Sequence, residues 1–137
     1  MDAFFAPYAH TLASLGGWAI LMLVLLFLSA KGKPRRRTES GHPVRDYSDP
    51  YYRRSRAFLN AIEITGPFVA ASVAAVLVGA APFLVNLFAS VFVISRVATA
   101  TAHIATENQP LRSIFWVIGL ICCLALSGLA IAGAFAL

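Results

Sequence analysis

Four long apolar stretches, separated by short polar or basic segments, dominate the pattern of hydrophobic and polar positions along the chain. A helix needs about 20 mostly apolar residues to span the hydrocarbon core of a bilayer, and each stretch is long enough. None shows the alternation of apolar and polar positions that is typical of a transmembrane barrel strand. The pattern predicts an all-α integral membrane protein, a four-transmembrane-helix bundle forming a single domain over residues 1–137. The expected spans cover residues 11–30, 57–80, 83–106 and 114–137.

The connections predict how these helices run. A Gly-Ala-Ala-Pro turn at residues 79–82 joins the second and third stretches, and its shortness requires an antiparallel hairpin. Nine of the eleven basic residues lie in the loop over residues 31–56, and the other two are Arg96 and Arg112. The positive-inside rule therefore predicts that this basic loop is cytoplasmic and that both termini lie outside. An alanine-rich chain with short loops favours a bacterial inner (plasma) membrane.

Composition supports lipid as the main solvent of the chain. Hydrophobic residues make up 59% and charged residues 12%, whereas a soluble domain carries about a quarter charged residues. The net charge of +5 does not predict a nucleic-acid partner, because the basic loop lies between apolar runs and is attracted to lipid headgroups. The first stretch has no basic residue before Lys31, so we expect a retained span and not a signal peptide. Adjacent Cys122 and Cys123 are expected to be lipid-facing or packed thiols, and no metal site is expected.

Polar residues inside the second and third spans mark a candidate site, because charged groups in hydrocarbon are costly and usually face protein or water. In each span they recur at intervals of three and four, which places them on one helical face. The residues in this pattern are Arg53, Arg56, Asn60 and Glu63 in the second span, and Arg96, Thr99 and His103 in the third.

Across an antiparallel hairpin, the start of the second span meets the end of the third, so we expect an ion pair between Glu63 and Arg96. The pair either fixes the helix register or belongs to a polar pocket on the cytoplasmic side. His103 is interpreted as a catalytic base or as a hydrogen-bonding residue at a helix end. Pro67 removes the amide that would bond to the carbonyl of Glu63 and is expected to loosen the helix, and Asp49 is expected to be a turn or cap residue. The pocket is expected to be lined by Arg56, Asn60, Glu63, Arg96, His103 and Arg112.

Three short motifs carry a family resemblance. The run RRSRAFLNAIEITGPF over residues 53–68 resembles the signature of the MAPEG family, the membrane-associated proteins in eicosanoid and glutathione metabolism. That signature reads Arg-x-x-Arg-Ala-x-x-Asn-x-x-Glu, with Pro-Phe four residues after the Glu. SRVATATAHIA and QPLRS resemble the end of the family's third helix and the Arg-Ser step that opens its fourth. The resemblance covers most of the chain.

The resemblance implies a homotrimer that binds glutathione between neighbouring protomers near the cytoplasmic face. It also implies that Arg112 and Ser113 lie near the thiol and are catalytic. A guanidinium beside a thiol favours the thiolate, which is the nucleophile, and arginines match the carboxylates of glutathione. The expected glutathione-binding residues are Arg53, Arg56, Asn60, Glu63, Arg96 and His103.

The expected function is a glutathione-dependent membrane transferase or peroxidase that acts on an apolar small-molecule electrophile arriving from the bilayer. Two alternatives stay open: a non-catalytic lipid-binding or accessory membrane subunit, since the family includes such a member, and a small proton-coupled transporter. Nearby arginines argue against the transporter, because a proton-coupled Glu is normally left unpaired. The chain departs from the best-known glutathione users at Leu59, Thr99, His103 and Trp116.

Overall fold

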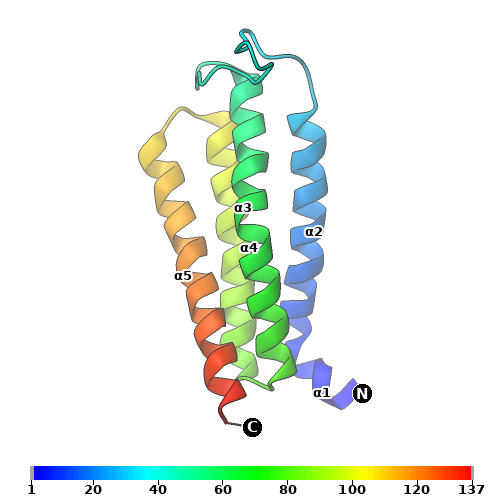
Figure 1. Ribbon diagram of the computed structural model, residues 1–137. Coiled ribbons are helices and arrows are strands. Elements are labelled where there is room, and N and C mark those ends of the chain that lie inside the picture. Colours follow the sequence, from blue (N-terminus) through cyan, green and yellow to red (C-terminus); the bar gives the residue numbers. More distant parts are fainter. Residues whose placement is uncertain (1, 137) are drawn as a thin grey trace.

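The computed structural model describes residues 2–136, and over these residues the chain is built of helices and loops without a β-strand. Each of the four long helices is long and apolar enough to cross a membrane. The predicted all-α, four-helix membrane bundle is therefore confirmed (Figure 1). The long helices are α2 (Ala9–Ser29), α3 (Pro50–Leu77), α4 (Pro82–Ala105) and α5 (Gln109–Ala134), and a short helix α1 (Asp2–Phe5) and a 3-10 turn η1 (Ala6–Tyr8) precede them.

Helix α3 begins earlier than the predicted span at residue 57. Asp49 is its N-cap residue, as expected, and its carboxylate accepts a hydrogen bond from the Tyr51 amide at 2.9 Å. Pro50 occupies the first helical position, where a missing amide costs nothing. Arg53 and Arg56 consequently lie in the first turns of the helix and not in an irregular loop.

Helix α5 also begins ahead of its predicted span, at Gln109. The side chain of Asn108 caps it by accepting a hydrogen bond from the Leu111 amide at 3.0 Å. Arg112 and Ser113 therefore project from the first turn of a regular helix. Their directions are set by helical geometry, so they hold a defined position relative to α3 and α4.

Pro67 does not interrupt α3, which is continuous from Pro50 to Leu77. The sharp change of direction comes instead at Gly79, whose φ of +66° is open to glycine at little cost. There the Gly79 amide donates to the Val76 carbonyl at 3.1 Å and the Ala80 amide to the Ala75 carbonyl at 3.0 Å. These bonds end α3 and fold α4 back against it as the predicted antiparallel hairpin.

The bundle packs around α4, which lies against α2, α3 and α5. Its centre is an aromatic cluster of Trp18, Phe68 and Phe92, all buried. Phe68 and Phe92 stack with ring centroids 3.8 Å apart, and Trp18 meets both edge-on. Many large apolar side chains remain exposed on the outer surface of the helices. Such an apolar exterior requires a lipid environment, so the chain is a multi-pass integral membrane protein.

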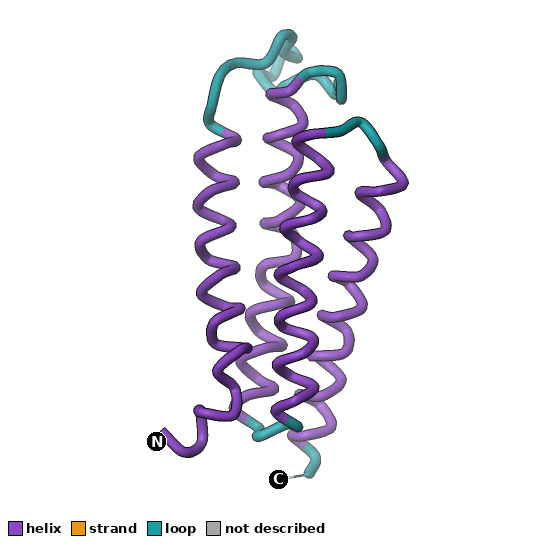
Figure 2. The backbone as a smooth tube through the Cα atoms, turned by 180° about the vertical axis from the view of Figure 1, so that it is seen from behind, coloured by secondary structure: helices purple, strands orange, loops and turns teal. Residues whose placement is uncertain are grey.

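The two ends of the bundle differ in their connections. The long α2–α3 loop and the α4–α5 link lie together at one end, called here the loop end (Figure 1). Both ends of the chain and the α3–α4 turn lie at the opposite end, called here the terminal end (Figure 2). The basic residues thus gather at the loop end.

Candidate functional site

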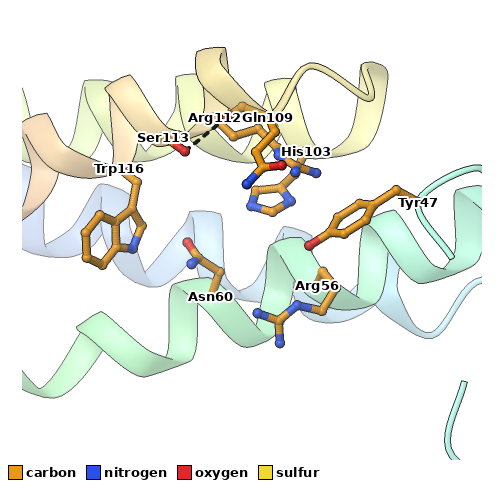
Figure 3. A pocket seen from close by; sticks show the side chains of 8 residues that line it. All are labelled: Tyr47, Arg56, Asn60, His103, Gln109, Arg112, Ser113 and Trp116. Atoms are coloured by element: carbon orange, nitrogen blue, oxygen red, sulfur yellow. Dashed lines mark hydrogen bonds between the residues drawn. The ribbon is translucent and has the colours of Figure 1, made fainter. Parts of the chain in front are cut away.

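A cavity of about 210 Å³ opens at the loop end, between α3, α4 and α5. Its walls come from four different segments, so the tertiary fold assembles it (Figure 3). The lining residues are Tyr47 from the α2–α3 loop, Arg56 and Asn60 from α3, His103 from α4, and Gln109, Arg112, Ser113 and Trp116 from α5.

The cavity is positively charged. Arg56 and Arg112 are its arginine side chains, and no carboxylate lines it within the described part of the chain. Arg112 is 8% exposed and His103 is 7% exposed. The Arg112 Nη1 and His103 Nδ1 atoms are buried and have no hydrogen-bond partner among residues 2–136. Buried polar groups are nearly always paired, so these atoms indicate a place for a ligand with anionic or hydrogen-bonding groups.

Arg96 lies deeper in α4 and braces one wall of this cavity. It is 3% exposed, and its Nη2 donates to the side-chain oxygen of Asn60 and, at 3.2 Å, to the Asn60 carbonyl. Gly119 on α5 makes room for it, because a Cβ at that position would lie 3.0 Å from the Arg96 Cδ. Arg96 therefore orients Asn60 and does not itself line the cavity.

The expected ion pair between Glu63 and Arg96 is wrong. Over the described residues the ion pair that forms is Arg53–Glu107, at 3.5 Å, and Glu63 is exposed. Glu63 is three residues after Asn60, and in a helix with 3.6 residues per turn its side chain points about 60° away from the direction of Asn60. That offset carries Glu63 away from the interior side of α3, and the guanidinium of Arg96 bonds to Asn60 instead.

Arg53 lies next to the cavity, but its guanidinium donates mainly to backbone carbonyls. Its Nε donates to the Ile104 carbonyl at 3.1 Å, and its Nη1 donates to the Tyr47 carbonyl at 2.7 Å. The same nitrogen pairs with Glu107 in the α4–α5 link. Arg53 thus ties the basic loop to the end of α4, whereas Arg56, one helical turn later, lines the cavity.

Ser113 is exposed at the cavity rim, and its hydroxyl donates to the Gln109 carbonyl at 3.1 Å (Figure 3). Of the eight residues expected in the site, the cavity lining brings together five, namely Arg56, Asn60, His103, Arg112 and Ser113. Arg96 is behind the wall, Arg53 is beside it, and Glu63 is on the outer side of α3.

Sequence reasoning missed Tyr47 and Gln109 as lining residues. Gln109 follows the helix cap Asn108, and the QPLRS motif that contains it could have drawn attention to it. Tyr47 stands in a polar loop without periodicity, so no local pattern marks it. Trp116 was singled out only as a departure from the family, and the structure places it in the lining at 38% exposed.

Comparison with known proteins agrees with this architecture. A family model described as "MAPEG family" matches residues 11–132 of the chain. The matched region contains every residue that lines the cavity. No curated protein matches the chain.

Proposed function

Because this chain belongs to the MAPEG family of membrane proteins in glutathione and eicosanoid metabolism, we propose that it is a glutathione-dependent membrane transferase or peroxidase acting on an apolar electrophile. The observation that carries this proposal is the loop-end cavity, which presents two arginines, buried polar atoms without partners and no carboxylate in the described chain. Glutathione carries two carboxylates and one ammonium, so its net negative charge matches the charge of this cavity.

In this proposal, Arg56 and Asn60 hold the peptide part of glutathione. The planar guanidinium of Arg56 suits a carboxylate, to which it can donate two parallel hydrogen bonds. Asn60 has its side-chain oxygen committed to Arg96, so its amide nitrogen is left to donate to the ligand. Arg96 therefore sets which group Asn60 offers, and the unpaired Nδ1 of His103 supplies a further polar contact.

Arg112 and Ser113 are the proposed catalytic residues. When bound, glutathione would supply a thiolate that attacks an electrophilic carbon and displaces a leaving group, or attacks a peroxide oxygen. The second reaction breaks the O–O bond, releases an alcohol and leaves a sulfenic acid that a second glutathione converts to the disulfide with loss of water. The Arg112 guanidinium would stabilise the negative charge on that sulfur, because a nearby cation favours the thiolate. The Ser113 hydroxyl already donates to the Gln109 carbonyl, so it is positioned to accept a hydrogen bond from the ligand.

The electrophile is proposed to enter from the bilayer. Trp116 lines the cavity and is partly exposed on α5. Leu59, which precedes the lining residue Asn60, and Val117, which follows Trp116, are exposed apolar residues. An apolar molecule dissolved in lipid could reach the thiol through this side, whereas glutathione would enter from the polar loop end. The two substrates would then approach the cavity from different solvents.

We propose that the protein is a homotrimer and that a neighbouring protomer completes the site. A cavity of about 210 Å³ is smaller than the 300–1,000 Å³ that is usual for small-molecule pockets. Glu63 lies on the exposed side of α3. There it would meet a ligand held between two protomers and could accept from the ammonium of glutathione.

The orientation in the membrane is also proposed. The loop end carries nine basic residues between positions 31 and 56, and the positive-inside rule places such loops in the cytoplasm. Both termini would then lie outside, on the periplasmic side of a bacterial inner membrane. A reporter enzyme that works only in the periplasm should be active when it is fused to the C-terminus. Activity of a fused reporter that works only in the cytoplasm would overturn this orientation.

Calorimetric titration of glutathione into the detergent-purified full chain tests the proposed function. We expect saturable binding that is weakened by Arg112→Ala and by Asn60→Ala. Thr101→Ala, on an exposed side of α4 away from the cavity lining, should leave the affinity unchanged. Absence of binding at millimolar glutathione in a folded oligomer would overturn the proposal and favour a non-catalytic lipid-binding or accessory subunit.

A further inference from the structure

Arg112 is held in the cavity by an aromatic ring and not by a carboxylate. Its Cζ atom lies 4.2 Å from the centroid of the Tyr47 ring. A cation within about 6 Å of a ring centroid is attracted to the face of the ring. No carboxylate of the described chain lies within ion-pair distance of Arg112. Tyr47 is thus the one side chain of the described residues that has a specific interaction with this guanidinium.

We propose that Tyr47 is a positioning residue of the loop-end site: its ring holds the Arg112 guanidinium by its face, so that the edge donors remain open toward the cavity. This inference rests on the proposed function, because it specifies how the glutathione-binding cation is oriented. A guanidinium carries its five N–H donors in one plane. A ring over the face leaves these donors free, whereas a carboxylate partner would occupy two of them and neutralise the charge.

The buried nitrogen of Arg112 supports this arrangement. Nη1 has no hydrogen-bond partner within residues 2–136, although the Arg112 side chain is only 8% exposed. A guanidinium over an aromatic ring tolerates this state better than an isolated one, because the ring supplies attraction without using a donor. The donor therefore stays available for an anionic ligand.

Tyr47 is itself fixed by its neighbours. Arg53 donates to its carbonyl at 2.7 Å, and its ring packs edge-on against Tyr52 with centroids 5.2 Å apart. The two residues that flank Tyr47 are also hydrogen-bonded: the Ser48 amide donates to the Asp46 Oδ1 atom at 2.9 Å. The hydrogen bonds from Ser48 lower the pKa of the exposed Asp46 carboxyl. The loop therefore carries Tyr47 as a preset support for Arg112. It also links the basic loop to the chemistry of the cavity.

The test compares Tyr47→Phe and Tyr47→Leu in the full-length protein, with glutathione affinity measured by calorimetry. Phenylalanine keeps the ring face and should bind like the wild type. Leucine keeps apolar volume but removes the ring, so the dissociation constant should rise by a factor of roughly 2 up to a limit of about 30, which would be reached if the whole cation–π contact served to hold Arg112 in its binding position. Tyr51→Leu is the matched control: Tyr51 is a half-buried tyrosine just beyond the same loop and outside the cavity lining, and it should leave affinity unchanged.

A second measurement separates positioning from loop packing. If Tyr47 acts through Arg112, Tyr47→Leu should weaken binding in the wild type and have no further effect in the Arg112→Ala background. Equal losses in both backgrounds, or an unchanged affinity of Tyr47→Leu, would overturn the inference. A loss in Tyr47→Phe as large as in Tyr47→Leu would also overturn it, because the hydroxyl would then be responsible. If the wild type itself does not bind glutathione, the proposed function fails, a result distinct from these three.

Discussion

The bundle contains two polar clusters at opposite ends, and they differ in how completely their groups are paired. At the terminal end, the Asn86 side chain joins α4 to α2 and to the turn η1 by hydrogen bonds. Its Oδ1 accepts from the Thr11 amide at 3.0 Å and from the Thr11 hydroxyl at 2.8 Å, while its Nδ2 donates to the Pro7 carbonyl at 2.7 Å. The Oγ atoms of Ser14 and Ser90 lie 3.5 Å apart between the same two helices, α2 and α4. The side-chain hydrogen-bonding groups of this cluster therefore find their partners within the protein.

At the loop end the pairing is incomplete. Arg96 Nε, His103 Nδ1 and Arg112 Nη1 are buried without partners within the described chain. An unpaired buried polar group costs about 1–3 kcal/mol. Elsewhere in residues 2–136, Trp18 Nε1 and Ser72 Oγ are also buried without partners away from the cavity, so what distinguishes the loop end is that such groups gather at and beside a cavity. The two clusters thus differ in their surroundings: the polar groups at the terminal end join helices, whereas those at the loop end lie at a cavity with hydrogen-bonding atoms available to a ligand.

Removing Arg112 should produce the largest effect on binding. Arg112→Ala removes a charged donor from the ligand, so glutathione should bind roughly 10- to 100-fold more weakly. The midpoint of thermal unfolding should change little, because the lost contact with Tyr47 is offset by removal of a buried cation whose Nη1 has no hydrogen-bond partner in the described chain. Calorimetric titration measures the affinity, and thermal unfolding of the detergent-purified protein measures the midpoint. A large loss of stability with unchanged affinity would reverse the distinction between the clusters.

Removing Asn86 should have the opposite signature. Asn86→Ala breaks three hydrogen bonds between α4 and the segment around α2. The free energy of unfolding should fall by about 1–2 kcal/mol, since an interhelical hydrogen bond in a membrane protein is worth about 0.6 kcal/mol on average. Glutathione affinity should be unchanged at temperatures where the variant is folded. Weakened binding without a change in stability would show that the terminal-end cluster also serves a ligand.

Two glycines on α5 sharpen the comparison at the level of packing. A Cβ at Gly133 would lie 2.5 Å from the Val78 Cγ2 atom, whereas a Cβ at Gly128 would meet nothing within 4 Å. Gly133→Ala should therefore lower stability by about 1 kcal/mol through overpacking. Gly128→Ala should be neutral or slightly stabilising, because alanine favours helix. Equal unfolding midpoints for the two variants would mean that the α3–α4 turn yields without cost.

Glu63 should show the smallest effect on stability. Glu63→Gln alters an exposed side chain without an ion pair in the described chain, so the free energy of unfolding should change by less than about 0.5 kcal/mol. Affinity for glutathione should nevertheless fall if Glu63 accepts from the ligand across a protomer boundary. An unchanged affinity would remove Glu63 from the proposed site, although the cavity residues would keep their roles.

Much of the fold could be predicted because its causes are local or one-dimensional. The length of each apolar stretch predicts a span, and Gly79 lies in a connection too short for anything but a hairpin. The cap at Asp49 was also predicted, although the early starts of α3 and α5 were not. Helix ends depend on single capping bonds, which an apolar stretch does not reveal.

The candidate site divides in the same way. Helical spacing placed Arg56 and Asn60 on one face, and both line the cavity. The same spacing suggested Glu63 as the partner of Arg96, but the hydrogen bonds of Arg96 go to Asn60. A difference of about 60° around the helix decides which polar group faces the interior. Only the packing of α3 against α4 sets that rotation.

By itself, then, the sequence determined that this protein spans the membrane four times with its basic residues mostly in one loop, because span length and charge are properties of contiguous segments. The tertiary structure decided that Arg96 donates to Asn60, that Arg53 joins the basic loop to the end of α4, and that the Tyr47 ring lies against the Arg112 guanidinium. These contacts join residues far apart in the chain. Each depends on helix rotation and loop path to within a few ångströms, and that precision comes only from the packing of the whole bundle.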